Sequence, residues 1–215
     1  MDCFEIINGN VNETNINPIE TGNKPIEINN KWVARGTLSQ ELRNLFKRAS
    51  AQYGINWKWL AALSYCESNW NSSVKNSLGY SYEGLCGFSQ STITNTLGKG
   101  HSSKSAEDQA FAAAKNIALN YNTAKKYGFD DESCYLYAGI CHNAGVGGAK
   151  WAYNNANPKT IEGIRQALLT HDGGYGPHGN KVGWFKVGSK EANRQNREKA
   201  EYPVKMKSAY YGIKE

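Results

Sequence analysis

The chain has 215 residues, of which 40% are hydrophobic and 20% are charged, a composition that supports one buried core and excludes a disordered chain. Its net charge of +6 favours a polyanionic partner. The lysines and arginines are scattered and form no nucleic-acid-binding motif, so we expect no nucleic acid partner.

Residues 1–36 differ from the rest of the chain. They are rich in Asn, Glu and Ile, contain Pro18 and Pro25, and lack helical periodicity. We expect an extended arm or linker that folds back on the domain or engages another subunit, followed by one domain over residues 37–215. Asp2 and Glu5 replace the basic start of a secretory signal, and no apolar segment follows them. No stretch is long and apolar enough to span a membrane, so we expect no membrane insertion.

The sequence of the domain predicts a series of helices. Thr37-Leu38-Ser39-Gln40 has the pattern of a capping box, which predicts a helix that runs to about Tyr53. Asn56 is placed to cap a second helix that continues toward Trp70. Further helices are predicted over 90–97, 106–126, 131–143, 161–170 and 191–211, the last with a break near Pro203.

Two stretches between the helices carry turn signals. A short hairpin is predicted near Tyr80. Residues 171–179 form a Gly-rich loop that is predicted to lie at the rim of a cleft. Trp184 and Phe185 follow this loop, and their residue types suit sugar stacking and core packing equally. The expected fold class is mainly α, with two helical lobes around a substrate groove.

Glu67 stands out because a carboxylate occupies a position where the helix pattern favours an apolar side chain. Leu60, Leu63 and Glu67 fall on one stripe, which directs Glu67 toward the core or the wall of a cleft. Burial and the negative end of the helix dipole both favour the protonated carboxyl group near neutral pH. A protonated carboxyl can act as the general acid that cleaves a glycosidic bond. On this helix alone, a Glu that turns to solvent or pairs with a lysine is equally plausible.

Three further segments accompany the Glu67 helix in a fixed order. The first is a glycine-bounded turn that leads into a helix at Gln90, the second is the end of a helix, and the third lies in the last helix. Their sequences are Gly84-Leu85-Cys86-Gly87-Phe88-Ser89-Gln90, His142-Asn143-Ala144-Gly145 and Glu198-Lys199-Ala200-Glu201-Tyr202-Pro203-Val204.

Together with Glu67-Ser68-Asn69-Trp70, these segments resemble the catalytic domain of soluble lytic transglycosylases, which share a fold with goose-type lysozymes. That family has Glu-Ser-x-aromatic, Gly-Leu-Met-Gln, Ala-Tyr-Asn-Ala-Gly and Glu-Thr-x-x-Tyr-Val in the same order. The resemblance covers roughly residues 37 to 212. Each motif alone is weak, but four in order are specific. Departures include Phe88-Ser89 for Leu-Met, His142 for Tyr, and Pro203 inserted before Val204.

The resemblance implies a lysozyme-like fold, cleavage of the β-1,4 bond between N-acetylmuramic acid and N-acetylglucosamine in peptidoglycan, and no cofactor. It assigns Glu67 as the catalytic acid and base and implies that Tyr202 holds the Glu67 carboxyl in position. Ser68, Gln90, His142 and Asn143 become candidate substrate-binding residues.

Each of these assignments has a structural alternative. Ser68 is equally well explained as a helix-end hydroxyl, and Gln90 as a helix cap. Asn143 could form a helix C-cap, because Asn tolerates the left-handed conformation. Tyr202 could be a core tyrosine. His142 could bind sugar, tune Glu67 or be a core histidine.

The cysteines and histidines predict no metal site. The five cysteines contain no Cys-x-x-Cys pair, and the four histidines form no short cluster. A nucleophilic pair of Cys66 and His142 is conceivable, but Cys66 is better explained by core packing. Cys134 and Cys141 lie two helical turns apart, too far for a disulfide.

The product and the setting are separate expectations. Only Glu67 carries a family signature, while Glu83, Asp172 and Glu201 are weaker candidates for the second carboxylate that a hydrolase requires. We therefore expect 1,6-anhydromuramyl products. The alternatives are a goose-type lysozyme, an enzyme acting on a related chitin-like glycan, or a non-catalytic glycan-binding or structural virion protein.

The place of action would be the bacterial cell wall, in the periplasm or outside the cell. We favour a phage particle, with virion or secretion-machine subunits as possible partners of the arm.

Overall fold

The structure is a computed structural model that describes residues 26–73, 84–170 and 190–214. Within these ranges the chain forms seven helices and no strand, so the expected mainly-α class is confirmed. The helices are α1 (Gln40–Tyr53), α2 (Trp57–Ser68), α3 (Gln90–Leu97), α4 (Ala106–Lys126), α5 (Asp131–Asn155), α6 (Ile161–Leu169) and α7 (Lys190–Gly212). The predicted hairpin near Tyr80, the Gly-rich loop over 171–179 and the Trp184-Phe185 pair lie outside the described residues.

The first six helices begin where the sequence offers a short polar side chain. Each cap oxygen accepts a backbone N–H from the first helical turn, which satisfies one of the donors that a helix start leaves unpaired. The caps are Ser39, Asn56, Ser89, Ser105, Asp130 and Thr160. The predicted bounds of α3 and α4 are confirmed for this reason.

Two predicted helix bounds need correction. The capping box at Thr37 is wrong, because Ser39 is the cap of α1 and Leu38 is buried before it. The predicted end of α5 at residue 143 falls two residues before a kink at Gly145, whose φ is 75°, but the helix then resumes and continues to Asn155, which was not predicted. Asn143 itself stays helical, so the predicted Asn C-cap is also wrong.

The predicted break in the last helix is absent, since α7 runs through Pro203. Proline removes one backbone donor and crowds the preceding turn. The carbonyl that loses its helical donor at Pro203 is that of Lys199, one turn earlier. The next carbonyl, that of Ala200, accepts a hydrogen bond from Nε of Arg165 at 2.7 Å, which ties α6 to α7 beside the proline.

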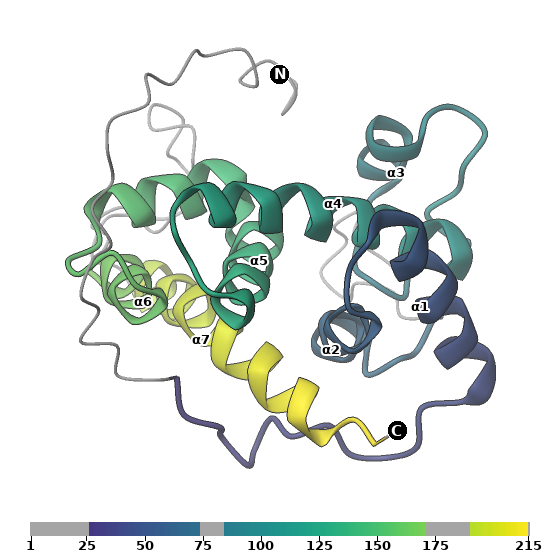
Figure 1. Cartoon of the computed structure of the whole chain (residues 1–215), viewed down its shortest axis with the longest axis horizontal. Helices are drawn as coiled ribbons and strands as arrows, with labels where there is room; N and C mark the ends of the chain where they lie inside the picture. The colour runs from purple at the N-terminus through teal and green to yellow at the C-terminus, as the bar shows by residue number, and fades with distance from the viewer. Residues whose placement is uncertain (1–25, 74–83, 171–189, 215) are drawn as a thin grey trace.

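Figure 1 shows α1, α2 and α3 toward one end of the molecule and α5 and α6 toward the other, with the long helix α4 reaching between them. Alanines make α4 thin enough to pack closely on its neighbours. The alanines with no exposed surface are Ala110, Ala112, Ala113, Ala114 and Ala124. Helix α7 runs beside α5 and α2, which brings a late segment of the chain against an early one (Figure 1).

The described part of the arm, residues 26–36, lies on the outside of α7 (Figure 1). Ile26 and Ala34 are buried, and the backbone N–H of Asn29 donates to Oγ of Ser208 at 2.9 Å. The backbone N–H of Arg35 donates to the hydroxyl of Tyr65 on α2 at 3.1 Å. This segment therefore folds back on the domain.

Candidate active site

Glu67 lies in the last turn of α2 and points inward. Leu60 and Leu63, on the same stripe of the helix, are fully buried, and the Glu67 side chain retains 22% exposure. The carboxyl group is thus set into the protein but still reaches solvent. This is the orientation that the spacing of the apolar residues predicts.

Two donors from distant helices converge on one oxygen of Glu67. The hydroxyl of Tyr202, on α7, donates to Oε1 at 2.5 Å, and Nε2 of His142, on α5, lies 3.4 Å from the same atom. Tyr202 is 3% exposed and the His142 side chain 9% exposed. Because both contacts use Oε1, the second oxygen, Oε2, is left on the side of the turn that precedes α3.

Gly87 in that turn lies directly against the carboxyl group. Its φ is +71°, and a Cβ atom at this position would lie 2.8 Å from Oε2 of Glu67. Both the left-handed backbone and the close approach require glycine. The next residue, Phe88, places its ring edge-on to His142 with centroids 5.0 Å apart, so the imidazole is held between the turn and α7.

The electrostatic environment lowers the pKa of Glu67, contrary to the expectation that the acid is protonated at neutral pH. Burial raises the pKa, but the positive charge of His142, hydrogen bonds from His142 and Tyr202, and the charge of Lys205 together outweigh it. Burial and the helix dipole, the two effects that the local sequence indicates, both act in the opposite direction. The groups that reverse the result come from α5 and α7.

Ser68 is a buried link between α2 and the turn. Its hydroxyl lies 2.8 Å from the carbonyl oxygen of Leu85 and 3.0 Å from that of Ser64, and it is 6% exposed. The hydroxyl of Ser64 also contacts the Leu85 oxygen, at 3.0 Å. Of its two candidate roles, Ser68 is placed for the structural one, because it fixes the turn opposite Glu67.

Gln90 begins α3, and its amide is used locally. Nε2 donates to the carbonyl of His101 at 2.8 Å and to Oγ1 of Thr94 at 3.2 Å, while Oε1 accepts from the backbone N–H of Ser103 at 2.9 Å. Asn143 follows His142 on α5 and is half-buried. Of the six predicted site residues, the structure therefore brings Tyr202 and His142 into contact with the Glu67 carboxyl, and Ser68 supports the turn beside it.

Gln109, on α4, is a site-supporting residue that the sequence reading missed. Its fully buried amide accepts the backbone N–H groups of Cys86 and Phe88 and donates to the carbonyls of Phe88 and Ser103. A signal was available, because Gln109 interrupts the alanine-rich stripe of α4. A buried amide in such a stripe must be bonded to something, and here it holds the turn.

The cysteines near Glu67 are not activated nucleophiles. Burial raises the pKa of the Cys66 and Cys86 thiols far above the usual range, and the negative charge of Glu67 raises it further. Cys66, Cys86, Cys134 and Cys141 are free thiols. In the part of the chain that the structure describes, no group of three or more metal-ligating side chains is close enough to hold a metal ion.

Of the three candidates for a second carboxylate, the structure describes one. Glu83 and Asp172 lie outside the described residues, and Glu201 is half-buried on α7. The charge effects that lower the pKa of Glu67 come from two basic side chains, His142 and Lys205, and not from an acid. No protein-family model matches the sequence, and a comparison with curated proteins gives no match either. Among the described helices, none is long and apolar enough to cross a membrane.

Proposed function

We propose that this protein is a peptidoglycan lytic transglycosylase with a lysozyme-like fold, cleaving the β-1,4 bond between N-acetylmuramic acid and N-acetylglucosamine. One observation carries the proposal: all four sequence motifs of the resemblance meet at Glu67. The first supplies the carboxyl, and the turn supplies Gly87. The third motif supplies His142, and the last supplies Tyr202, 135 positions along the chain. A purely structural helix would not need a carboxyl held by two donors in the interior.

Glu67 is the proposed acid and base. Tyr202 and His142 fix the carboxyl through Oε1, and Oε2 is the oxygen available to exchange a proton with the substrate. In the free protein the lowered pKa favours the carboxylate. A bound glycan excludes water and so strengthens burial, the one effect here that favours the protonated acid. Glu67 is therefore expected to take up its proton in the substrate complex.

The reaction needs one carboxyl group if the substrate supplies the nucleophile. Glu67 gives its proton to the leaving oxygen as the glycosidic bond breaks, and the acetamido group of the muramyl sugar stabilises the positive charge. The carboxylate then takes the proton of the 6-hydroxyl as that oxygen bonds to the anomeric carbon. This reaction consumes no water and leaves a 1,6-anhydromuramyl end.

The remaining assignments belong to the same proposal. Asn143, beside His142, is proposed to contact the glycan, whereas Ser68 and Gln90 are proposed to act by shaping the walls of the site. The enzyme would act at the bacterial wall, and a phage particle remains our proposed setting. Peptidoglycan strands are the proposed partner.

The first test is the variant Glu67→Gln, assayed by the loss of turbidity of purified cell walls. Loss of general acid catalysis costs on the order of 100-fold to 10,000-fold in rate. The amide keeps the volume of the carboxyl and can still accept from Tyr202, so we expect the melting temperature to change little. Near-normal cleavage by this variant would remove Glu67 from the mechanism and favour a glycan-binding or structural role.

The second test identifies the acceptor. Peptidoglycan is digested in oxygen-18 water and the fragments are weighed by mass spectrometry. We expect anhydro products without the heavy oxygen. Reducing ends that carry oxygen-18 would make the protein a lysozyme and return attention to Glu83, Asp172 and Glu201.

A further inference from the structure

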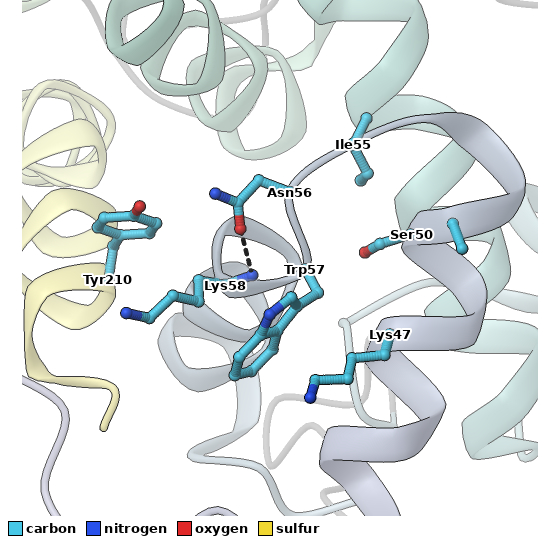
Figure 2. Close-up of a pocket in the computed structure, with 8 residues that line it drawn as sticks. Lys47, Ser50, Ile55, Asn56, Trp57, Lys58 and Tyr210 are labelled. Carbon is cyan, nitrogen blue, oxygen red and sulfur yellow. Dashed lines mark hydrogen bonds between the residues drawn. The ribbon is translucent and has the colours of Figure 1, made fainter. Parts of the chain in front are cut away.

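A groove with a volume of about 450 Å³ lies at the beginning of α2, the end opposite Glu67 (Figure 2). Residues from α1, the connection between α1 and α2, α2 and α7 line it: Lys47, Ser50, Ala51, Ile55, Asn56, Trp57, Lys58 and Tyr210. A helix rises 1.5 Å per residue, so the ten positions between Trp57 and Glu67 place this groove about 15 Å along α2 from the carboxyl group. It is separate from the site described above.

The groove is electropositive. Lys47 and Lys58 both line it, and the lining residues that the structure describes include no acid. The N-terminal end of α2, a helix of 12 residues, also opens here behind its cap Asn56 and adds a partial positive charge. These features favour an anionic group in the groove.

Ser50 gives an independent indication of a ligand. The residue is 2% exposed, and among the described residues its Oγ is the one buried side-chain polar atom without a hydrogen-bond partner. In Figure 2 this oxygen points from α1 toward the space between Trp57 and Asn56. Buried hydroxyls normally form a hydrogen bond. A hydroxyl without one on the wall of an electropositive groove therefore points to a ligand whose oxygen accepts this bond.

Two aromatic rings complete the groove. Tyr210 stacks on Trp59 with centroids 4.1 Å apart, and Trp59 stacks on Tyr135 at 5.3 Å, so the orientation of the Tyr210 ring is fixed. Nζ of Lys58 lies 5.5 Å from the centre of Tyr210, and Nζ of Lys47 lies 5.4 Å from that of Trp57. Each half-buried ring thus has a lysine ammonium over it, which brings an aromatic surface and a cation together in the groove.

We propose that this groove binds a sugar that carries an oxyanion, either a phosphate or a carboxylate, as a unit of an acidic glycan. The oxyanion lies between Lys47, Lys58 and the start of α2, and a ligand oxygen accepts the Ser50 hydroxyl. The sugar ring packs on Trp57 or Tyr210. The choice of a wall glycan as the source rests on the proposed function, whereas the chemistry of the ligand does not.

The proposal is tested by NMR chemical-shift titration of the full chain with glucose 6-phosphate, glucuronate, glucose, inorganic phosphate and adenosine monophosphate. We expect at least one charged sugar to shift the Trp57 indole signal and to bind about tenfold more tightly than glucose or inorganic phosphate. Preference for the phosphate or for the carboxylate sugar identifies the oxyanion. None of these probes has a bond that Glu67 is proposed to cleave, so the result is independent of the enzymatic proposal.

The variant Ser50→Ala separates a ligand contact from a packing role. It should weaken binding of the charged sugar about tenfold without lowering the melting temperature, because the hydroxyl it removes makes no bond in the free protein. The matched control is Ser208→Ala, which removes a buried hydroxyl that is bonded to Asn29 and to the carbonyl of Val204. This control should lower the melting temperature and leave sugar binding intact. Unchanged binding in Ser50→Ala, equal binding of all sugars, or tighter binding of adenosine monophosphate than of glucose 6-phosphate would overturn the proposal.

Discussion

At the residue scale, the chemistry of Glu67 depends on two donors that share one carboxylate oxygen. Tyr202 supplies a neutral hydroxyl at 2.5 Å, and His142 supplies a ring nitrogen at 3.4 Å. The hydroxyl gives a short, directed hydrogen bond, and the ring supplies the largest of the effects that lower the pKa. Substitution of Tyr202 is therefore expected to affect the reaction rate, and substitution of His142 the pKa of Glu67.

Tyr202→Phe is expected to lower kcat more than it raises KM. A hydrogen bond to a charged group contributes about 1.5–3 kcal/mol, which corresponds to roughly 10-fold to 100-fold in rate if it is lost in the transition state. The matched control is Tyr211→Phe on the same helix, which removes a tyrosine hydroxyl that donates to Glu132 at 2.9 Å. Cleavage kinetics on soluble glycan strands provide the measurement. An unchanged kcat with raised KM would instead place Tyr202 on the binding surface.

His142→Gln is expected to raise the pKa of Glu67, because burial remains and the largest opposing effect is removed. In the native protein the lowered pKa contributes stability above the ordinary Glu value of about 4.3, and this contribution is lost as the pH falls through the folded-state pKa. In the variant the folded-state pKa is higher, so this contribution should be smaller and its loss should be complete at higher pH. Carbon-13 NMR of the Glu67 carboxyl measures the shift directly.

The control for this experiment is His101→Gln. His101 also contacts a carboxylate, with Nδ1 2.7 Å from Oδ1 of Asp108, but its side chain is exposed and it is not among the groups that shift the pKa of Glu67. It should leave the Glu67 titration unchanged. If both variants gave the native titration, His142 would be a packing residue and not an electrostatic one.

At the element scale, the turn before α3 is held from both sides. Ser64 and Ser68 contact the Leu85 oxygen from α2, while Gln109 satisfies the backbone of Cys86 and Phe88 from α4. These bonds leave the turn little freedom beside Glu67. The position of Gly87 is therefore set by two helices as well as by its own backbone.

Gly87→Ala is expected to lower both stability and cleavage. The left-handed backbone costs a non-glycine residue roughly 1–2 kcal/mol, and the added Cβ must displace the Glu67 carboxyl. Gly54→Ala is a matched control, since Gly54 has φ +67° and no atom within 4 Å of the added Cβ. Both variants should melt at lower temperature, and only Gly87→Ala should lose activity. Full activity in Gly87→Ala would show that the turn can move away from Glu67 without harm to catalysis.

At the scale of the whole molecule, the arm and the site are connected through α7. The outer face of α7 is covered by residues 26–36, and Nζ of Lys205 lies 4.4 Å from the centre of the Trp32 ring. Lys205 is also one of the charges that lower the pKa of Glu67. The arm thus packs on the same helix that presents Tyr202 to the carboxyl group.

Removal of residues 1–36 is expected to lower the melting temperature more than removal of residues 1–25. The longer deletion exposes the surface beneath Ile26 and breaks the hydrogen bond from Asn29 to Ser208. Burial of one large aliphatic side chain contributes about 1.5–3 kcal/mol, which corresponds to several degrees for a domain of this size. Calorimetry of the two truncated proteins makes the comparison. Equal melting temperatures would show that the described part of the arm adds nothing to stability.

The sequence by itself determined several of the helices and the inward orientation of Glu67. Local caps and apolar spacing are sufficient to place α2, α3 and α4 and to turn Glu67 inward, because these features act within a few residues. The tertiary structure decided the charge of that carboxyl and the roles of Gly87 and Gln109. It also decided the continuity of α7 through Pro203. The physical reason is that a pKa is a sum over all neighbours, and a buried amide is satisfied by partners that lie far from it in the sequence. Such partners are distant in sequence, so only the packed molecule brings them together.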